Sequence, residues 1–136
     1  MSEEWEIDED AEPDDELRQI TNRIIGAAIE VHKQLGPGHA EITYENALAL
    51  EFAYRGIPFK RQLPFGVFYR GEQVGQGRLD FLIEERVVLE LKAVESLHPL
   101  FTSQVISYLK ASNHRLALLI NFNVRRLIDG LKRIKY

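Results

Sequence analysis

Asp80, Glu90 and Lys92 are the residues best suited to chemistry, and they stand in two segments otherwise rich in apolar residues. Glu90 and Lys92 lie two positions apart in the apolar run 87–94, and residues i and i+2 of a strand point to the same face. Burying charges without partners is costly, so charged residues in such a strand usually have a partner or a function. The alternative is a solvent-exposed face on which Glu90 and Lys92 form a weak ion pair.

Asp80 is the expected partner, because a tight turn at Glu84-Glu85 would bring its strand beside that of Glu90. Two carboxylates held close together repel, and a hard divalent cation relieves that repulsion. Mg²⁺ held by one or two carboxylates keeps several waters, which leaves room for phosphate oxygens and an attacking water. Lys92 beside such a cation can stabilise the nucleophile or the charge that develops on phosphorus. Oxygen ligands with a lysine favour phosphodiester hydrolysis over acyl transfer.

Hydrophobic periodicity indicates the elements that must position these side chains. Apolar residues recur at spacings of three and four over residues 17–35 and predict a helix, which Gly36-Pro37-Gly38 ends. Segments with alternating or aromatic and β-branched residues, bounded by turn residues, predict strands. The predicted helices are 17–35, 41–54, 99–111 and 124–131, and the predicted strands are 59–69, 76–83, 87–94 and 116–120.

The order of these elements predicts the fold class. A meander of three strands followed by a helical crossover to a further strand implies a mixed sheet with helices on both faces. The high apolar content of the run 87–94 favours a central position for that strand, covered on both faces. The sequence therefore predicts an α/β fold with a mixed central sheet.

Charge is distributed unevenly along the chain. Residues 1–16 contain ten of the 21 acidic residues and no Lys or Arg, so the remainder carries 11 acids against 17 bases. We expect an acidic disordered tail, 1–16, and a mildly basic domain, 17–136; the tail is either solvated or lies along a basic groove in place of DNA. The chain lacks cysteine, which excludes disulfides and thiolate metal sites. We expect no membrane span and a cytoplasmic location, because no apolar run is long enough to cross a bilayer.

Three short motifs give the chain a resemblance to the PD-(D/E)XK nuclease superfamily. Asp80 together with Glu90-Leu91-Lys92 resembles its metal-binding signature. Gln104-Val105-Ile106-Ser107-Tyr108 matches the QxxxY motif of the branch that is similar to RecB, and Gly38-His39-Ala40-Glu41-Ile42-Thr43-Tyr44 matches the GxxExxY motif of a family of small bacterial proteins. The similarity extends from about residue 17 to residue 136 and implies a restriction-endonuclease-like αβββαβ core.

The resemblance also implies roles for individual residues. The implied metal ligands are Asp80, Glu90, the backbone carbonyl of Leu91 and Glu41, with Glu45 as the substitute for Glu41. Lys92 is the implied catalytic lysine. The implied substrate contacts are Gln104, Tyr108 and Tyr44. Gln104 and Tyr108 could instead orient the lysine, and Tyr44 could instead be a packing residue.

We therefore expect a Mg²⁺- or Mn²⁺-dependent nuclease in which a metal-activated water attacks phosphorus without a covalent intermediate. The resemblance favours DNA over RNA, and its QxxxY motif favours exonuclease action on single strands or ends. Relatives often have a histidine before the QxxxY helix, where this chain has Phe101, with His98 nearby. The alternative is a non-enzymatic nucleic-acid-binding or adaptor protein that keeps the nuclease fold. The sequence does not indicate the oligomeric state.

Overall fold

A computed structural model describes residues 15–136 of the chain, and the predicted acidic tail lies almost wholly outside these described residues. None of the helices within residues 15–136 is long and apolar enough to cross a membrane. The elements are α1 (Asp15–Leu35), α2 (Glu41–Arg55), β1 (Phe59–Tyr69), β2 (Glu72–Ile83), β3 (Val87–Lys92), α3 (Pro99–Ser112), β4 (Leu116–Asn121), the 3₁₀ turn η2 (Leu127–Gly130) and β5 (Leu131–Lys135).

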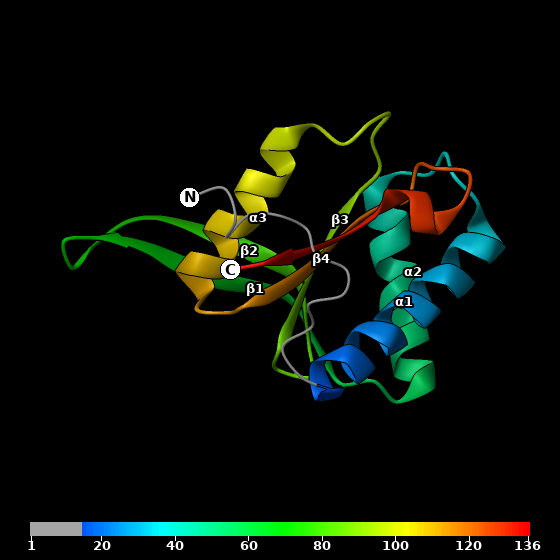
Figure 1. Ribbon diagram of the computed structural model, residues 1–136, viewed down its shortest axis with the longest axis horizontal. Helices are drawn as coiled ribbons and strands as arrows, with labels where there is room; N and C mark the ends of the chain where they lie inside the picture. The colour runs from blue at the N-terminus through cyan, green and yellow to red at the C-terminus, as the bar shows by residue number, and fades with distance from the viewer. Residues whose placement is uncertain (1–14) are drawn as a thin grey trace.

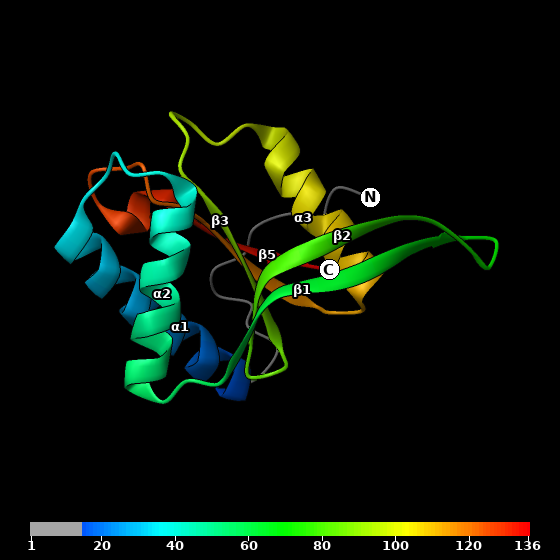
Figure 2. The same cartoon turned by 180° about the vertical axis from the view of Figure 1, so that it is seen from behind.

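Five strands form one mixed sheet in the order β1-β2-β3-β4-β5. Neighbouring strands run antiparallel except β3 and β4, which are parallel because α3 carries the chain across the sheet between them. α1 and α2 pack on one face of the sheet and α3 packs on the other, as Figures 1 and 2 show from opposite sides. This arrangement confirms the predicted α/β fold with helices on both faces of a mixed sheet.

Each face of the sheet has its own apolar core. Under α1 and α2 the core includes the predicted stripe of α1, with Ile20, Ile24 and Val31 buried. The core under α3 consists of Leu79, Leu82, Val88, Val105, Ile106, Leu109, Ala117, Leu119 and Ile134. Residues 87–91 of β3 are all buried; Val87, Leu89 and Leu91 belong to the core under α1 and α2 and Val88 to the core under α3, so β3 is covered on both faces as predicted.

β3 ends at Lys92, two residues earlier than predicted, because a side chain takes over from the strand ladder. The Val94 N–H donates to Asn121 Oδ1 at 3.0 Å, and Asn121 Nδ2 donates to the Val94 carbonyl at 3.0 Å. The Phe122 N–H donates to the Lys92 carbonyl at 2.9 Å. Asn121 is buried, so these bonds fix the direction in which the chain leaves the sheet just after Lys92.

The helix predicted over residues 124–131 is wrong. This segment has a single 3₁₀ turn, η2, and then β5, which pairs antiparallel with β4. Leu131 packs against the core under α1, whereas Ile134 is buried in the core under α3. Residues three apart lie on one side of a helix but on opposite faces of a strand, so a strand lets both side chains reach a core.

β1 and β2 extend beyond the rest of the sheet as a two-stranded arm (Figures 1 and 2). β1 pairs with β2 along its whole length, whereas β2 pairs with β3 only over residues 81–83. β2 is also longer than predicted, since it begins at Glu72 rather than Gln76. From Asp80 toward the tip of the arm, β2 therefore has no ladder pairing with β3.

Candidate functional site

Two carboxylates bridge β2 and β3 where the ladder between these strands ends. The main-chain N–H of Asp80 donates to Glu90 Oε2 at 2.8 Å, and the N–H of Leu91 donates to Asp80 Oδ2 at 2.8 Å. These amides lie just past the last pair of the β2–β3 ladder, where the opposite strand no longer supplies acceptors. The structure thus brings Asp80 and Glu90 together, with one oxygen of each bound to the opposite strand.

Burial opposes the ionisation of both carboxylates. Glu90 is only 6% exposed, and burial, followed by the negative charge of Asp80, raises its pKa to about 8. Burial also raises the pKa of Asp80, although the N–H of Leu91 opposes that shift by stabilising the ionised form. The alternative of a solvent-exposed face for Glu90 and Lys92 is therefore wrong. A cation beside this pair would favour the ionised form of both acids.

Lys92 reaches the same site from the end of β3, on the side covered by α3. Its ammonium nitrogen lies over the ring of Phe101, 4.4 Å from the ring centroid, which is a favourable cation–π contact. The positive charge of Lys92 lowers the pKa of both Asp80 and Glu90, partly offsetting the effect of burial. The Phe101 ring of α3 therefore contacts the ammonium group of Lys92, whose charge acts on the two acids.

The structure separates the roles of Glu41 and Glu45, the two acids of α2 that were expected near the metal. The Glu45 carboxylate is buried, and it accepts from Arg61 Nε at 2.6 Å and from Gln62 Nε2 at 2.9 Å. Glu41 lies one turn earlier, and burial, followed by the negative charge of Asp80, raises its pKa. The positive charge of Lys92 opposes this shift, because it lowers the pKa of Glu41. Glu41 is therefore the acid of α2 that remains available to the site, whereas Glu45 is bound to β1.

No motif in the sequence indicates Arg61 or Gln62, which both bind Glu45 of α2, and Gln62 also reaches Asp80. Gln62 stands opposite Asp80 in the register of the arm, with a left-handed φ of 53°, and its Nε2 lies 3.5 Å from Asp80 Oδ1. Non-glycine residues in this region of backbone space are concentrated at functional sites. No sequence motif marks such a position, because the conformation depends on how β1 pairs with β2.

Arg61→Ala is expected to lower the free energy of unfolding by about 2 kcal/mol or more, because it leaves the buried Glu45 carboxylate without its cation. Urea denaturation of the variant and the wild type measures this loss. Arg23→Ala is the matched control, since Arg23 pairs with Glu84 on the exposed surface and should contribute less than about 1 kcal/mol. Equal losses in the two variants would contradict a specific role for Arg61.

Tyr44 does not lie where a substrate could contact it. The ring is fully buried and stacks on Phe122, with 4.6 Å between ring centroids. Its hydroxyl donates to the Gly36 carbonyl at 2.6 Å and accepts from the His39 N–H at 3.1 Å. The substrate-contact interpretation of Tyr44 is therefore wrong, and its packing interpretation holds. The hydroxyl ties the loop before α2 to the helix that carries Glu41.

Of the two α3 residues expected to contact a substrate, Tyr108 lies within electrostatic reach of the carboxylates. Burial, followed by the negative charges of Glu90 and Asp80, raises the pKa of its hydroxyl. Its ring also contacts Phe65 on the arm, with 5.1 Å between centroids. Gln104 lies one turn earlier on α3 and is exposed, so it is open to a ligand from solvent.

The donor set at this site fits a hard divalent cation. Asp80 and Glu90 each use one oxygen for a main-chain N–H, so the ligand atoms would be Glu90 Oε1 and Asp80 Oδ1, the latter with only a long contact of 3.5 Å from Gln62 Nε2. Within residues 15–136, no three His, Asp or Glu side chains stand close enough to enclose an ion by themselves. Mg²⁺ is commonly held by one or two carboxylates with water completing its shell, so the pair is sufficient.

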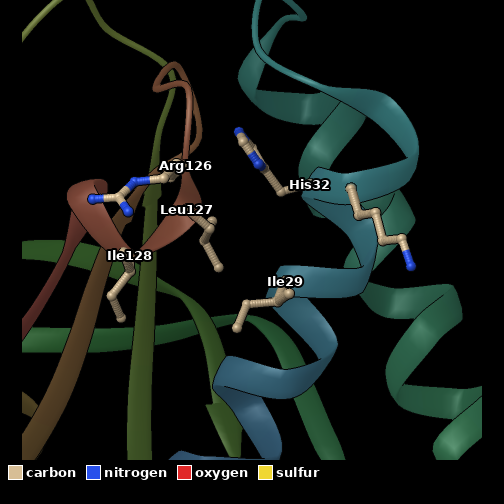
Figure 3. Close-up of a pocket in the computed structure, with 6 residues that line it drawn as sticks. Ile29, His32, Arg126, Leu127 and Ile128 are labelled. Atoms are coloured by element: carbon tan, nitrogen blue, oxygen red, sulfur yellow. The ribbon is translucent and has the colours of Figure 1, made fainter.

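A separate hollow of about 300 Å³ lies between the end of α1 and η2, and Figure 3 shows its lining. It is lined by Ile29, His32, Lys33, Arg126, Leu127 and Ile128. His32 Nε2 lies 2.8 Å from the Val124 carbonyl, so this histidine ties α1 to the segment before η2. None of the residues of the carboxylate site lines this hollow.

The comparison with known families agrees with this geometry. A family model described as the PD-(D/E)XK nuclease superfamily matches residues 18–134, which takes in nearly every element from α1 to β5. No curated protein and no solved structure matches the chain.

Proposed function

Because this chain belongs to the PD-(D/E)XK nuclease superfamily, we propose that it is a divalent-metal-dependent nuclease that cleaves DNA at a centre formed by Asp80, Glu90 and Lys92. The observation that carries the proposal is the pair of reciprocal hydrogen bonds that holds two buried carboxylates together. Two adjacent buried acids are costly without a compensating cation, and the lysine alone supplies a single positive charge. A divalent cation would supply the positive charge that the two ionised acids still lack.

The residues that would hold the cation, Mg²⁺ or Mn²⁺, are Asp80, Glu90 and the main-chain carbonyl of Leu91, with Glu41 binding through a water of its shell, because Glu41 does not form a three-carboxylate cluster with the pair. When bound, a divalent cation neutralises the acids, polarises a phosphate oxygen and lowers the pKa of an attacking water. The proximity of Glu41 to Asp80 supports its inclusion, since the charge of Asp80 raises the pKa of Glu41. Neutralising Asp80 would therefore also favour the ionised form of Glu41.

Lys92 would stabilise the negative charge that develops on the phosphate oxygens during attack by water on phosphorus. The Phe101 ring limits where the ammonium group can go, so its position is set before the substrate binds. Preorganised charge of this kind acts most strongly in the transition state, where the extra charge appears. Water attack in line breaks the P–O bond directly, with no covalent enzyme intermediate.

Within the superfamily, we assign the chain to the GxxExxY family. The loop before α2 supports this assignment, because each residue of the motif has a physical purpose. Gly38 has a φ of 103°, a conformation that side chains rarely adopt, and the Tyr44 hydroxyl bonds to both ends of the loop. Together they fix the start of α2, where Glu41 lies in the first turn.

We further propose DNA as the substrate and exonuclease action on single strands or ends. The QxxxY pair supports this choice, since Gln104 and Tyr108 lie one turn apart on α3. Tyr108 is close enough to the carboxylates for their charges to raise its pKa. A strand bound along this side of α3 would pass directly over the reactive centre.

The nuclease proposal is tested by incubating the protein with end-labelled single-stranded DNA, linear duplex DNA and RNA, in Mg²⁺, Mn²⁺ or EDTA. We expect single-stranded DNA to shorten from an end, only with a divalent cation present. Asp80→Asn keeps an oxygen for the Leu91 N–H, so it should fold and be inactive. Wild-type protein that leaves every substrate intact would refute the nuclease proposal and favour a binding or adaptor role.

A further inference from the structure

The outer part of the β1–β2 arm exposes apolar side chains. Phe68, Tyr69 and Val74 are each 64% exposed, and Val67 is 38% exposed. Their backbone belongs to a two-stranded segment with no further strand beside it, and such hairpins gain little stability by themselves. Clustered apolar groups on a projecting element are typical of binding surfaces.

The exposed groups adjoin a hollow of about 430 Å³ between the arm and α3. It is lined by Gly66, Val67, Phe68, Ser107, Lys110 and Ala111. Tyr108, the neighbour of Ser107, contacts Phe65 of the arm and is affected by the charge of Glu90. The hollow therefore lies on the part of α3 next to Tyr108, the residue that the charges of the carboxylate site reach.

Two glycines let aromatic rings lie directly on the backbone of the arm. A Cβ atom at Gly66 would come within 2.8 Å of the Phe68 ring, and one at Gly77 would come within 2.5 Å of the Phe65 ring. With glycine at these positions, each ring can lie close against the strand. An exposed ring supported from below is a suitable surface for stacking a nucleobase.

Charge identifies the kind of partner that this surface fits. Residues 59–79 and α3 together hold five bases, Lys60, Arg61, Arg70, Arg78 and Lys110, against one acid, Glu72. Lys60 and Arg61 pair with acids outside these segments, whereas the other three have no acidic partner in the described part of the chain. A second copy of the same arm would meet like charge. A polyanion would be attracted to it.

We propose that the hollow between the arm and α3 binds an unpaired stretch of the nucleic-acid strand, with a base on Phe68 and a phosphate at Lys110. This inference rests on the proposed function, because the strand would lead into the carboxylate site. Stacking on Phe68 requires a free base face, which a paired duplex offers only at its ends. The arm would thus select single-stranded over duplex substrate.

Fluorescence anisotropy of a 5′-fluorescein single-stranded oligonucleotide, measured in EDTA so that no cleavage occurs, tests this site. Phe68→Ala should raise the Kd roughly tenfold. Lys110→Gln should reduce the slope of log Kd against log salt by about 0.7, the value for one lost phosphate contact on a single strand. The matched controls are Tyr54→Ala, which removes an 87% exposed ring on α2, and Lys33→Gln on α1, and both should bind like the wild type.

The possible results separate this inference from the nuclease proposal. If Phe68→Ala and Lys110→Gln bind the oligonucleotide more weakly than the wild type, the arm site is supported. If the wild-type protein in the same series cleaves no substrate, the nuclease proposal is refuted. Cleavage by the wild type with unchanged binding in both arm variants would refute the arm site alone. If Phe68→Ala instead converts a dimer to a monomer in sedimentation and leaves binding unchanged, a second copy covers the arm and the inference is wrong.

Discussion

Lys92→Ala is expected to slow phosphodiester cleavage by about 100- to 1,000-fold, the usual effect of removing one preorganised charge from a transition state. The fold should persist, because Lys92 is the last residue of β3 and its side chain is only partly buried. The affinity for Mn²⁺ should not fall, since the variant keeps both carboxylates and removes a competing positive charge. Single-turnover cleavage with excess protein measures the chemical step directly.

Two further variants make the Lys92 result specific. Phe101→Leu keeps the ammonium charge but removes the ring that holds it, so its rate should lie between those of the wild type and Lys92→Ala. Lys33→Ala removes an exposed lysine on α1 and should cleave like the wild type. A Lys92→Ala rate within a few-fold of the wild-type rate would contradict a catalytic role for this lysine.

Glu90→Gln is expected to abolish a pH-dependent stabilisation of the protein by Mg²⁺. In the folded state the pKa of Glu90 is raised from 4.5 to about 8, so the folded chain retains a proton that the unfolded chain releases. In EDTA, the free energy of unfolding of the wild type should therefore fall as the pH rises from about 5 to about 8. Mg²⁺ binds the ionised carboxylates, so the stabilisation that it provides should grow over the same interval.

Thermal unfolding at pH 6 and pH 8, in EDTA and in Mg²⁺, measures both effects. At a hundred-fold excess over its Kd, Mg²⁺ should stabilise the wild type at pH 8 by about 2.7 kcal/mol, which is several degrees in Tm. Glu90→Gln keeps an acceptor for the Asp80 N–H, so in EDTA at pH 8 it should be more stable than the wild type and indifferent to Mg²⁺. Wild-type stability that rises with pH in EDTA would contradict the burial of this acid.

The sequence was sufficient to predict that Asp80, Glu90 and Lys92 lie together, because their geometry is local. Glu90 and Lys92 share a strand whose apolar content predicts a central position, and a turn of a few residues connects that strand to Asp80. Strand alternation and one tight turn therefore predict that the two acids meet. The spacing of apolar residues likewise predicts which faces of α1 and α3 are buried, since each helix buries residues three to four positions apart.

The features that the sequence did not predict depend on long-range pairing. Arg61 and Gln62 bind Glu45 from β1, and Gln62 does so with a positive φ that its residue type does not predict. β5 is stabilised because Leu131 and Ile134 pack into cores on opposite faces of the sheet. The short basic sequence of this segment does not indicate that either core lies beside it. The place of Tyr44 in the GxxExxY motif left substrate contact and packing both open, and only the structure shows that its hydroxyl bonds within the chain.

If Asp80 and Glu90 share one divalent cation, calorimetric titration of Mn²⁺ at pH 8 should reveal it without any substrate. We expect one binding event per chain in the wild type and no binding in Asp80→Asn, which keeps the bond to the Leu91 N–H. Asp129→Asn, which removes an acid of η2 paired with Arg126, should bind like the wild type. Equal binding by Asp80→Asn and the wild type, or no binding by either at two temperatures, would contradict a metal centre between β2 and β3.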